Sequence, residues 1–380
     1  MVVQSIPAPS PEFSPATLVA RVREVLYALP DPRKGGNHQR YAIGDAGLSA
    51  LAMVFMQSPS FLDFQRRMQY ERGANNAGTL FGVDQIPSDQ QIRNRLDPIP
   101  PESVFEVFVE FVEALYEPGA LASHRGPHGG VMIAFDGVQY HSSKTIHCPQ
   151  GSTRTLSNGQ THYCHTAVTP AIVAPGQAGV FALPPAFVTP QDGTEKQDCE
   201  LNAATRWLQD WGARVRPWRP LFLGDDLDCH QPFCEQVLAQ GGDFLFVCLP
   251  ASHALLYEWI GDFERTGDLN TYTKTRWTGT QHVKDTYRWI NAVPLRDGSG
   301  RFRPTGVNSP SPIPPGRCST TTPGPPRAPS INTASSPWWP PPAAAGRSRT
   351  NTTTPSRLRA ITLSTMMATA ANTSPPCSRP

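Results

Sequence analysis

Residues 130–143 decide the fold, and they spell Gly-Val-Met-Ile-Ala-Phe-Asp-Gly-Val-Gln-Tyr-His-Ser-Ser. An apolar run at 131–135 follows Gly130 and leads into Asp136, after which Gly137 lets the chain turn away. A short apolar run bounded by glycine is typical of a buried strand. We therefore expect a strand that delivers the Asp136 carboxylate to one edge of a sheet.

A second stretch has the same design, Leu-Phe-Leu-Gly-Asp-Asp at residues 221–226. If the two strands are neighbours, their acids meet at one sheet edge, where hard divalent cations take carboxylate oxygens. A structural role is the alternative for each acid, because Asp-Gly is a turn signal and Asp is a frequent helix N-cap. The pair is more informative than either acid alone and predicts a two-metal phosphoryl-transfer site.

The composition is compatible with a protein of two or three domains, since 380 residues can bury a sizeable core. Nine of the 33 basic residues lie in residues 301–380, which contain no acid, so the preceding part is acidic overall. Eight Cys without repeating spacing and no apolar N-terminal leader predict reduced thiols and a cytoplasmic location. No run of 18 apolar residues is present, so we expect no membrane span.

A zinc cluster can be drawn from five residues in the middle of the chain. Their spacing contains no Cys-x-x-Cys pair, so ordinary strand and loop positions are the favoured interpretation. The five are His147, Cys148, His162, Cys164 and His165.

The N-terminal part predicts a disordered leader at 1–15 and a helical domain at 16–122. Apolar residues recur at helical spacing over 16–29, 43–56 and 61–70, and Ser88 and Ser103 are expected to cap two further helices. Seven basic residues of this part are candidate contacts to DNA phosphates, with a solvated helix face as the alternative. They are Arg33, Lys34, Arg40, Arg66, Arg67, Arg93 and Arg95.

The next part, 130–298, predicts a mixed α/β core. After the first acid strand we expect antiparallel strands near 139–141, 162–168 and 179–183, then a helix over 195–211. The second acid strand, a helix over 231–240 and an apolar strand over 244–249 follow. This order is that of a ribonuclease H-like sheet, in which the first and fourth strands lie adjacent and bring their acids together.

Several short sequence motifs of this core resemble those of the DDE transposases of bacterial insertion sequences, in the broad family named after insertion sequence 4. They are Phe-Asp-Gly at 135–137 with His-Ser-Ser-Lys at 141–144, Leu-Gly-Asp-Asp-Leu at 223–227 with Gln-Pro-Phe at 231–233, and the strand at 287–297. In the helical part, Asp-Pro-Arg at 31–33 and Ser-Asp-Gln at 88–90 are also similar to the domain that precedes such cores.

The resemblance implies cleavage of DNA at an element's ends and attack of the freed 3′-hydroxyl on target DNA. Asp136 and Asp225 would hold two Mg²⁺ or Mn²⁺ ions, one activating the nucleophile and one stabilising the leaving oxygen. Asp226 is the neighbouring candidate for the second position. The partners implied are the terminal-repeat DNA, the target DNA and a second copy of the chain.

The third carboxylate of such a site is missing from this chain. The family places a Glu on a later helix, and no acidic residue follows Asp297. The segment 299–380 is rich in Pro, Arg, Ser and Thr, and as written it predicts a disordered tail. A shifted reading frame over 344–367 permits a run with one Arg, a Glu beyond it and a downstream Lys, which resembles the family's closing motif. We therefore infer a frameshift near residues 298–302.

Three functions follow from these observations, and the least favoured is a nuclease of the same fold that acts on another substrate. The first is a transposase-like protein that binds divalent metal but is catalytically defective, because two aspartates without the glutamate position the ions poorly. The second is a non-catalytic DNA-binding protein, in which the helical domain and the Arg-rich tail bind DNA phosphates and the strand-end aspartates serve as turn and cap residues.

Overall fold

The computed structural model describes residues 14–31, 41–70, 74–117, 119–126, 128–190, 198–277, 282–290, 305–308 and 316–320. These residues form a mixed α/β protein with helices at the N-terminal end and a large mixed sheet. Within this described part, every helix is too short or too polar to span a lipid bilayer. The expected leader lies outside it apart from residues 14 and 15, where Ser14 caps the first helix.

The N-terminal helices close around a core of their own. Phe64, Phe81 and Leu48 are fully buried in this core. The helix after Ser88 is confirmed, since the Ser88 hydroxyl accepts a hydrogen bond from the Gln91 N–H. The other expected helices are also present, with bounds shifted by a few residues, but Ser103 lies inside a 3-10 turn and does not cap the helix that follows it. The elements are α1 (Pro15–Tyr27), α2 (Ile43–Phe55), α3 (Phe61–Gln65) with a π-helical turn (Arg66–Tyr70), α4 (Ala74–Thr79) and α5 (Asp89–Leu96).

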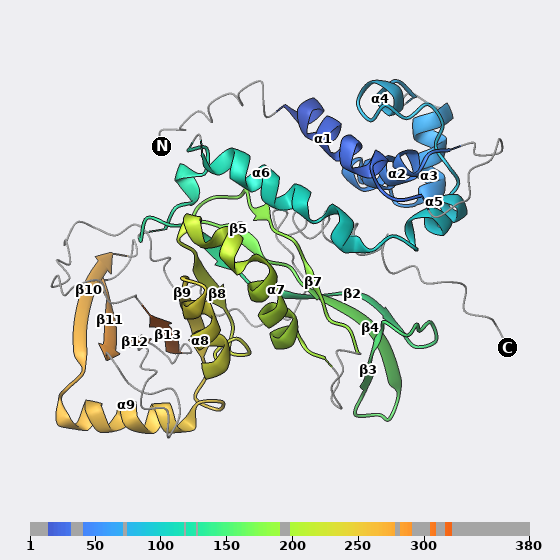
Figure 1. Ribbon diagram of the computed structural model, residues 1–380. Helices are drawn as coiled ribbons and strands as arrows, with labels where there is room; N and C mark the ends of the chain where they lie inside the picture. Colours follow the sequence, from blue (N-terminus) through green and yellow to red (C-terminus); the bar gives the residue numbers. More distant parts are fainter. Residues whose placement is uncertain are drawn as a thin grey trace.

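Helix α6 (Glu106–Tyr116), entered through a 3-10 turn (Pro101–Val104), joins the helical part to the sheet. Figure 1 shows α6 lying between the N-terminal helices and the sheet. Phe105, just before the helix, packs in the N-terminal core, whereas Val109 and Val112 pack in the core of the sheet. Because one helix serves both cores, the two parts are held together by buried apolar surface.

The main sheet has the order β10-β11-β12-β13-β9-β8-β1-β5-β6 within the described residues. At its centre β1 is parallel to β8, and β8 is parallel to β9, whereas β5 and β6 continue the sheet antiparallel from β1. The expected neighbourhood of the two acid strands is therefore confirmed. The central strands are β1 (Met132–Ala134), β5 (Ala171–Val173), β6 (Phe181–Ala182), β8 (Leu221–Gly224) and β9 (Asp243–Cys248).

The strand expected near 139–141 and the one at 162–168 do not belong to this sheet, which corrects the sequence prediction. They pair with each other in a second sheet of order β2-β4-β3, to which β7 adds. The prediction was wrong because the polarity pattern of a strand does not specify which of the neighbouring strands it pairs with. The second sheet contains β2 (Gly137–Ser143), β3 (Ser152–Thr155), β4 (Thr161–Val168) and β7 (Ala186–Phe187).

Helices α7 (Glu200–Val215) and α8 (Gln231–Ala239) provide the apolar cover of the central strands. Trp207 of α7 and Phe233 of α8 are buried, and both contact Phe135 at the end of β1. Phe135 also stacks on Phe222 of β8, with ring centroids 5.4 Å apart. This aromatic cluster fixes the backbone immediately before Asp136.

Beyond β9 the chain adds α9 (Ala254–Thr266), β10 (Asn270–Trp277) and β11 (His282–Ile290). The segment 299–380 was expected to be disordered, but it contributes two short strands, β12 (Thr305–Asn308) and β13 (Gly316–Thr320). Strand β13 pairs antiparallel with β9 and so extends the sheet past the acid strands. The rest of this segment, including all of 321–380, lies outside the described residues.

Candidate active site

Asp136 and Asp225 leave the sheet at the same edge. Strands β1 and β8 are paired parallel, with Ala134 opposite Leu223, and each Asp lies two residues beyond that pair. The Phe135 N–H donates to the Leu223 carbonyl oxygen over 2.9 Å, so the pairing continues up to the acids. Because the strands run in one direction, the two exposed carboxylates emerge side by side.

Glu200, at the first position of α7, brings a third carboxylate to this edge. Its carboxylate lies against Gly137, where the Cβ of any other residue would overlap it. Burial raises the pKa of Glu200, and the negative charges of Asp225 and Asp136 raise it further. The charges of both aspartates therefore act on Glu200, as expected for carboxylates that belong to one site.

A buried ion pair sets the start of α7. The Asp198 side chain is fully buried and accepts two hydrogen bonds from Arg206, at 3.1 and 2.6 Å, as well as one from the Thr189 N–H. Despite its burial, the pKa of Asp198 is lowered, because these hydrogen bonds and the Arg206 charge favour the ionised form. The pair anchors the residues that precede Glu200 and thereby orients its carboxylate.

Asp228 places a fourth carboxylate behind the edge. It is buried, and its carboxylate occupies the space that a Cβ at Gly224 would need. Burial raises its pKa to about 7, and Asp225 and Glu200 add to the shift. The sequence analysis missed both Glu200 and Asp228. The signal for Glu200 was an acid at the start of the helix before the second acid strand. The signal for Asp228 was a third acid within residues 225–228.

The geometry favours Asp225 over Asp226 as the partner of Asp136. The Asp226 carboxylate is turned toward the loop after β9, where it accepts hydrogen bonds from the Leu249 N–H, at 2.6 Å, and from the Ser252 hydroxyl. Asp225 accepts only a local bond from the Leu227 N–H, at 2.8 Å, among the hydrogen bonds found for its side chain. Asp225 is also the acid whose charge acts on Glu200 and Asp228.

Carboxylate oxygens are the ligands that hard cations such as Mg²⁺ prefer, and the charges of Asp136 and Asp225 both act on Glu200. The three carboxylates do not form a group with all ligand atoms within 4.8 Å of one another in the described structure. Burial is the main cause of the raised pKa values of Glu200 and Asp228, and repulsion between the neighbouring carboxylates adds to it. A divalent cation would remove that repulsion, so the site has the charge that a cation offsets.

The candidate DNA contacts divide into three groups. Arg66 and Arg67 are exposed and form ion pairs with Asp63, at 3.6 and 2.9 Å. Arg95 instead ties α5 to the rest of the domain, because it donates to the Tyr41 carbonyl oxygen and covers the Tyr41 ring. Arg93 is exposed on the same helix. The remaining candidates, Arg33, Lys34 and Arg40, lie outside the described residues.

The His and Cys residues of the second sheet do not gather into a metal site in the described structure. Cys148 Sγ lies 3.3 Å from His165 Nε2, but His147 packs on Tyr163 and Cys164 faces the Ser152 carbonyl oxygen. The group of metal-binding type that the described residues contain is Cys229, Cys248 and His253. Its members come from three separate segments without a spaced Cys pair, which explains why the sequence did not reveal it.

Comparison of the sequence with models of known protein families and with curated proteins finds no match.

Proposed function

We propose that this chain is a transposase-like protein whose acidic edge binds divalent metal for phosphoryl transfer on DNA. The observation that carries the proposal is the parallel register of β1 and β8, which brings Asp136 and Asp225 together. The strand order β6-β5-β1-β8-β9, antiparallel then parallel, supports a ribonuclease H-like core. Such cores use strand-end carboxylates to act on phosphodiesters.

In this proposal each acid has a defined task. Asp136 and Asp225 bind the cation directly, and Glu200 adds a carboxylate from the helix side of the edge. Asp228 keeps the negative potential at the rear of the site. When bound, divalent ions polarise a phosphoryl oxygen and lower the pKa of the attacking water or hydroxyl. The protein's part is to hold the carboxylates within one ion's reach.

The proposed activity is defective in this polypeptide. The family's closing carboxylate comes after the last sheet strands, and this chain has no acid after Asp297. Glu200 lies on α7, before the second acid strand, so it does not replace the carboxylate that the family places on a later helix. Loss of one member of a catalytic unit commonly removes most of the rate. We therefore expect metal binding without efficient strand cleavage.

The test compares the 380-residue chain with a chain expressed after a one-base correction near codons 298–302. Both are assayed for nicking of supercoiled plasmid in Mg²⁺ and in Mn²⁺, with Asp225→Asn in each background. We expect nicking by the corrected chain that Asp225→Asn abolishes, and nicking near background by the original chain. Rapid Mg²⁺-dependent nicking by the original chain would contradict the defect. DNA binding with no metal-dependent chemistry in either chain would favour the non-catalytic DNA-binding protein.

A further inference from the structure

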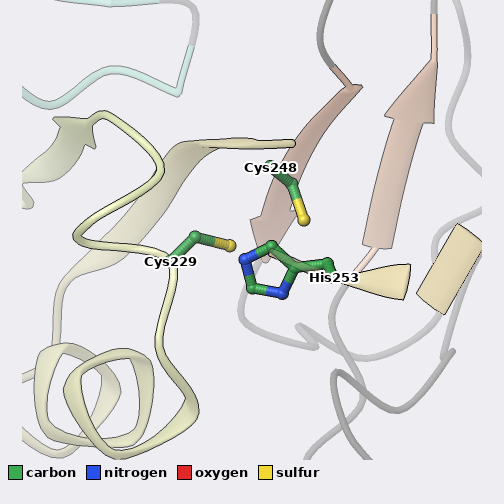
Figure 2. A group of neighbouring side chains, drawn as sticks. All are labelled: Cys229, Cys248 and His253. Carbon is green, nitrogen blue, oxygen red and sulfur yellow. The ribbon is translucent and has the colours of Figure 1, made fainter. Parts of the chain in front are cut away.

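A second group of potential ligands lies beyond the acidic edge, at the ends of the central strands. Cys229 precedes α8, Cys248 ends β9, and His253 caps α9. Their ligand atoms all lie within 4.8 Å of one another, and all three side chains are buried. Figure 2 shows the two sulfur atoms and the imidazole converging on one point from three segments.

His253 Nε2 is buried and makes no hydrogen bond of good geometry, although Cys229 and Asp226 both lie close to it. In Figure 2 the ring nitrogen farther from the side-chain attachment, which is Nε2, points at the Cys229 sulfur. A buried polar atom without a partner is costly, and in a native protein it indicates a missing water, ion or ligand.

Asp226 lies beside His253, although it is not among the three residues whose ligand atoms all lie within 4.8 Å of one another. Its Oδ1 lies 3.5 Å from His253 Nε2, close to the ligand–ligand distance of roughly 3.4 Å that a tetrahedral zinc ion with N and O ligands requires. Hydrogen bonds from the Leu249 N–H and the Ser252 hydroxyl orient this carboxylate and leave lone pairs for a further partner.

A nucleophilic Cys-His-Asp arrangement is the competing explanation, and the geometry disfavours it. Such a relay needs the thiol at one imidazole nitrogen and the carboxylate at the other. Here Cys229 and Asp226 both approach the same nitrogen, Nε2. Cys229 is also fully buried, which denies a substrate access to its sulfur. Convergence on one point is what a metal ion requires.

We propose that Cys229, Cys248 and His253 bind one Zn²⁺ ion, with Asp226 as the fourth ligand. Thiolate and imidazole are ligands that zinc prefers, whereas Mg²⁺ and Mn²⁺ prefer oxygen, so this site and the acidic edge select different ions. The two thiols lose their protons to solvent as the two Zn–S bonds form. With Asp226 as the fourth ligand, the set would leave no open position and the ion would be structural.

The ion connects the segment after β8, the end of β9 and the start of α9. It thereby fixes Asp226, and with it the backbone of the adjacent Asp225 at the acidic edge. The zinc site is thus independent of catalysis but supports the geometry of the proposed active site.

The experiment uses the full chain, purified with zinc and dialysed against a weak chelator. Mass-spectrometric metal analysis is expected to find one zinc per chain. Replacement by Co²⁺ is expected to give a thiolate-to-cobalt charge-transfer band and the intense visible bands of tetrahedral cobalt. Cys229→Ser, Cys248→Ser and His253→Ala should each lose the ion or the tetrahedral spectrum, whereas the matched control Cys234→Ser, also a buried thiol, should retain both.

Absence of bound zinc and of the cobalt bands in the folded unsubstituted chain would overturn the proposal without any variant. Unchanged zinc content in Cys229→Ser or Cys248→Ser would do the same. Asp136→Asn distinguishes this site from the acidic edge, because it should keep the zinc and the cobalt spectrum. Loss of zinc in Asp136→Asn together with retention in Cys248→Ser would assign the ion to the acidic edge instead.

Discussion

Replacement of Glu200 by Gln should have opposite effects on the metal-free and the metal-bound protein. Without metal, the variant removes one of the carboxylates that repel each other at the edge, where Asp225 and Asp136 raise the pKa of Glu200. With metal, the same change removes an oxygen that the cation uses. The sign of the stability change therefore reverses when Mg²⁺ is added.

The magnitudes follow from simple electrostatics and linkage. Two unit charges about 6 Å apart repel by roughly 3 kcal/mol at an effective dielectric constant of 20. Solvent at this exposed edge reduces the gain from Glu200→Gln to about 1 kcal/mol. A cation at about 100 times its Kd stabilises the native protein by about 2.7 kcal/mol, and a roughly 100-fold weaker Kd leaves about 0.4 kcal/mol.

Thermal unfolding at pH 8 with and without Mg²⁺ measures both effects. The unsubstituted chain should gain roughly 5 to 10 °C in Tm from the cation, and Glu200→Gln roughly 1 °C. Without cation, Glu200→Gln should melt a few degrees higher than the unsubstituted chain. Glu258→Gln, an exposed Glu on α9, is the control and should behave as the unsubstituted chain. A Glu200→Gln protein that keeps the full Mg²⁺ gain would refute the reasoning.

Substitutions at Asp97, Arg206 and Asp228 should also change stability or metal binding. Burial raises the pKa of Asp97 to about 7, so the free energy of unfolding should fall as pH rises from about 4 to 7. In urea unfolding, Asp97→Asn should therefore raise the free energy of unfolding by about 1 kcal/mol at pH 8 and change it little at pH 4. Arg206→Ala should cost about 2 kcal/mol at pH 7, because it leaves the buried Asp198 carboxylate uncompensated. Since the pKa of Asp198 is lowered in the folded state, this cost should shrink as pH falls through that pKa. Arg214→Ala is the control: it breaks an exposed ion pair with Glu106 and should lower the free energy of unfolding by under about 1 kcal/mol in the same urea assay. The pKa of Asp228 is about 7, so the Mg²⁺ affinity measured by calorimetry should weaken by up to about tenfold per pH unit below pH 7 and level off above it. Asp228→Asn should make the affinity less dependent on pH.

The strands that carry Asp136 and Asp225 could be predicted because their signal is local. Each is a short apolar run that ends in an acid, and burial on both faces makes such runs distinctive. The helix after Ser88 was predictable for the same reason, since the cap and the Gln three residues later are adjacent in sequence. The pairing of β1 with β8 required one further step, the order of strands and helices along the chain.

Glu200 could not be predicted because its position depends on tertiary packing. The helix was expected to begin near residue 195, and the residues that anchor its actual start include the Asp198–Arg206 pair and Phe187. Cys229, Cys248 and His253 meet only after α8 and β9 have folded against β8. The second sheet was missed for a similar reason, because β2 and β4 are separated by a long hairpin that includes β3.

The shared cation at Asp136 and Asp225 is the central claim, and a manganese titration followed by electron paramagnetic resonance tests it most directly. The chain is predicted to bind Mn²⁺ saturably, and both Asp136→Asn and Asp225→Asn should abolish that binding. Asp210→Asn, an exposed Asp on α7, should leave it intact. Binding of Mn²⁺ by Asp136→Asn or Asp225→Asn at the level of the unsubstituted chain would contradict the claim.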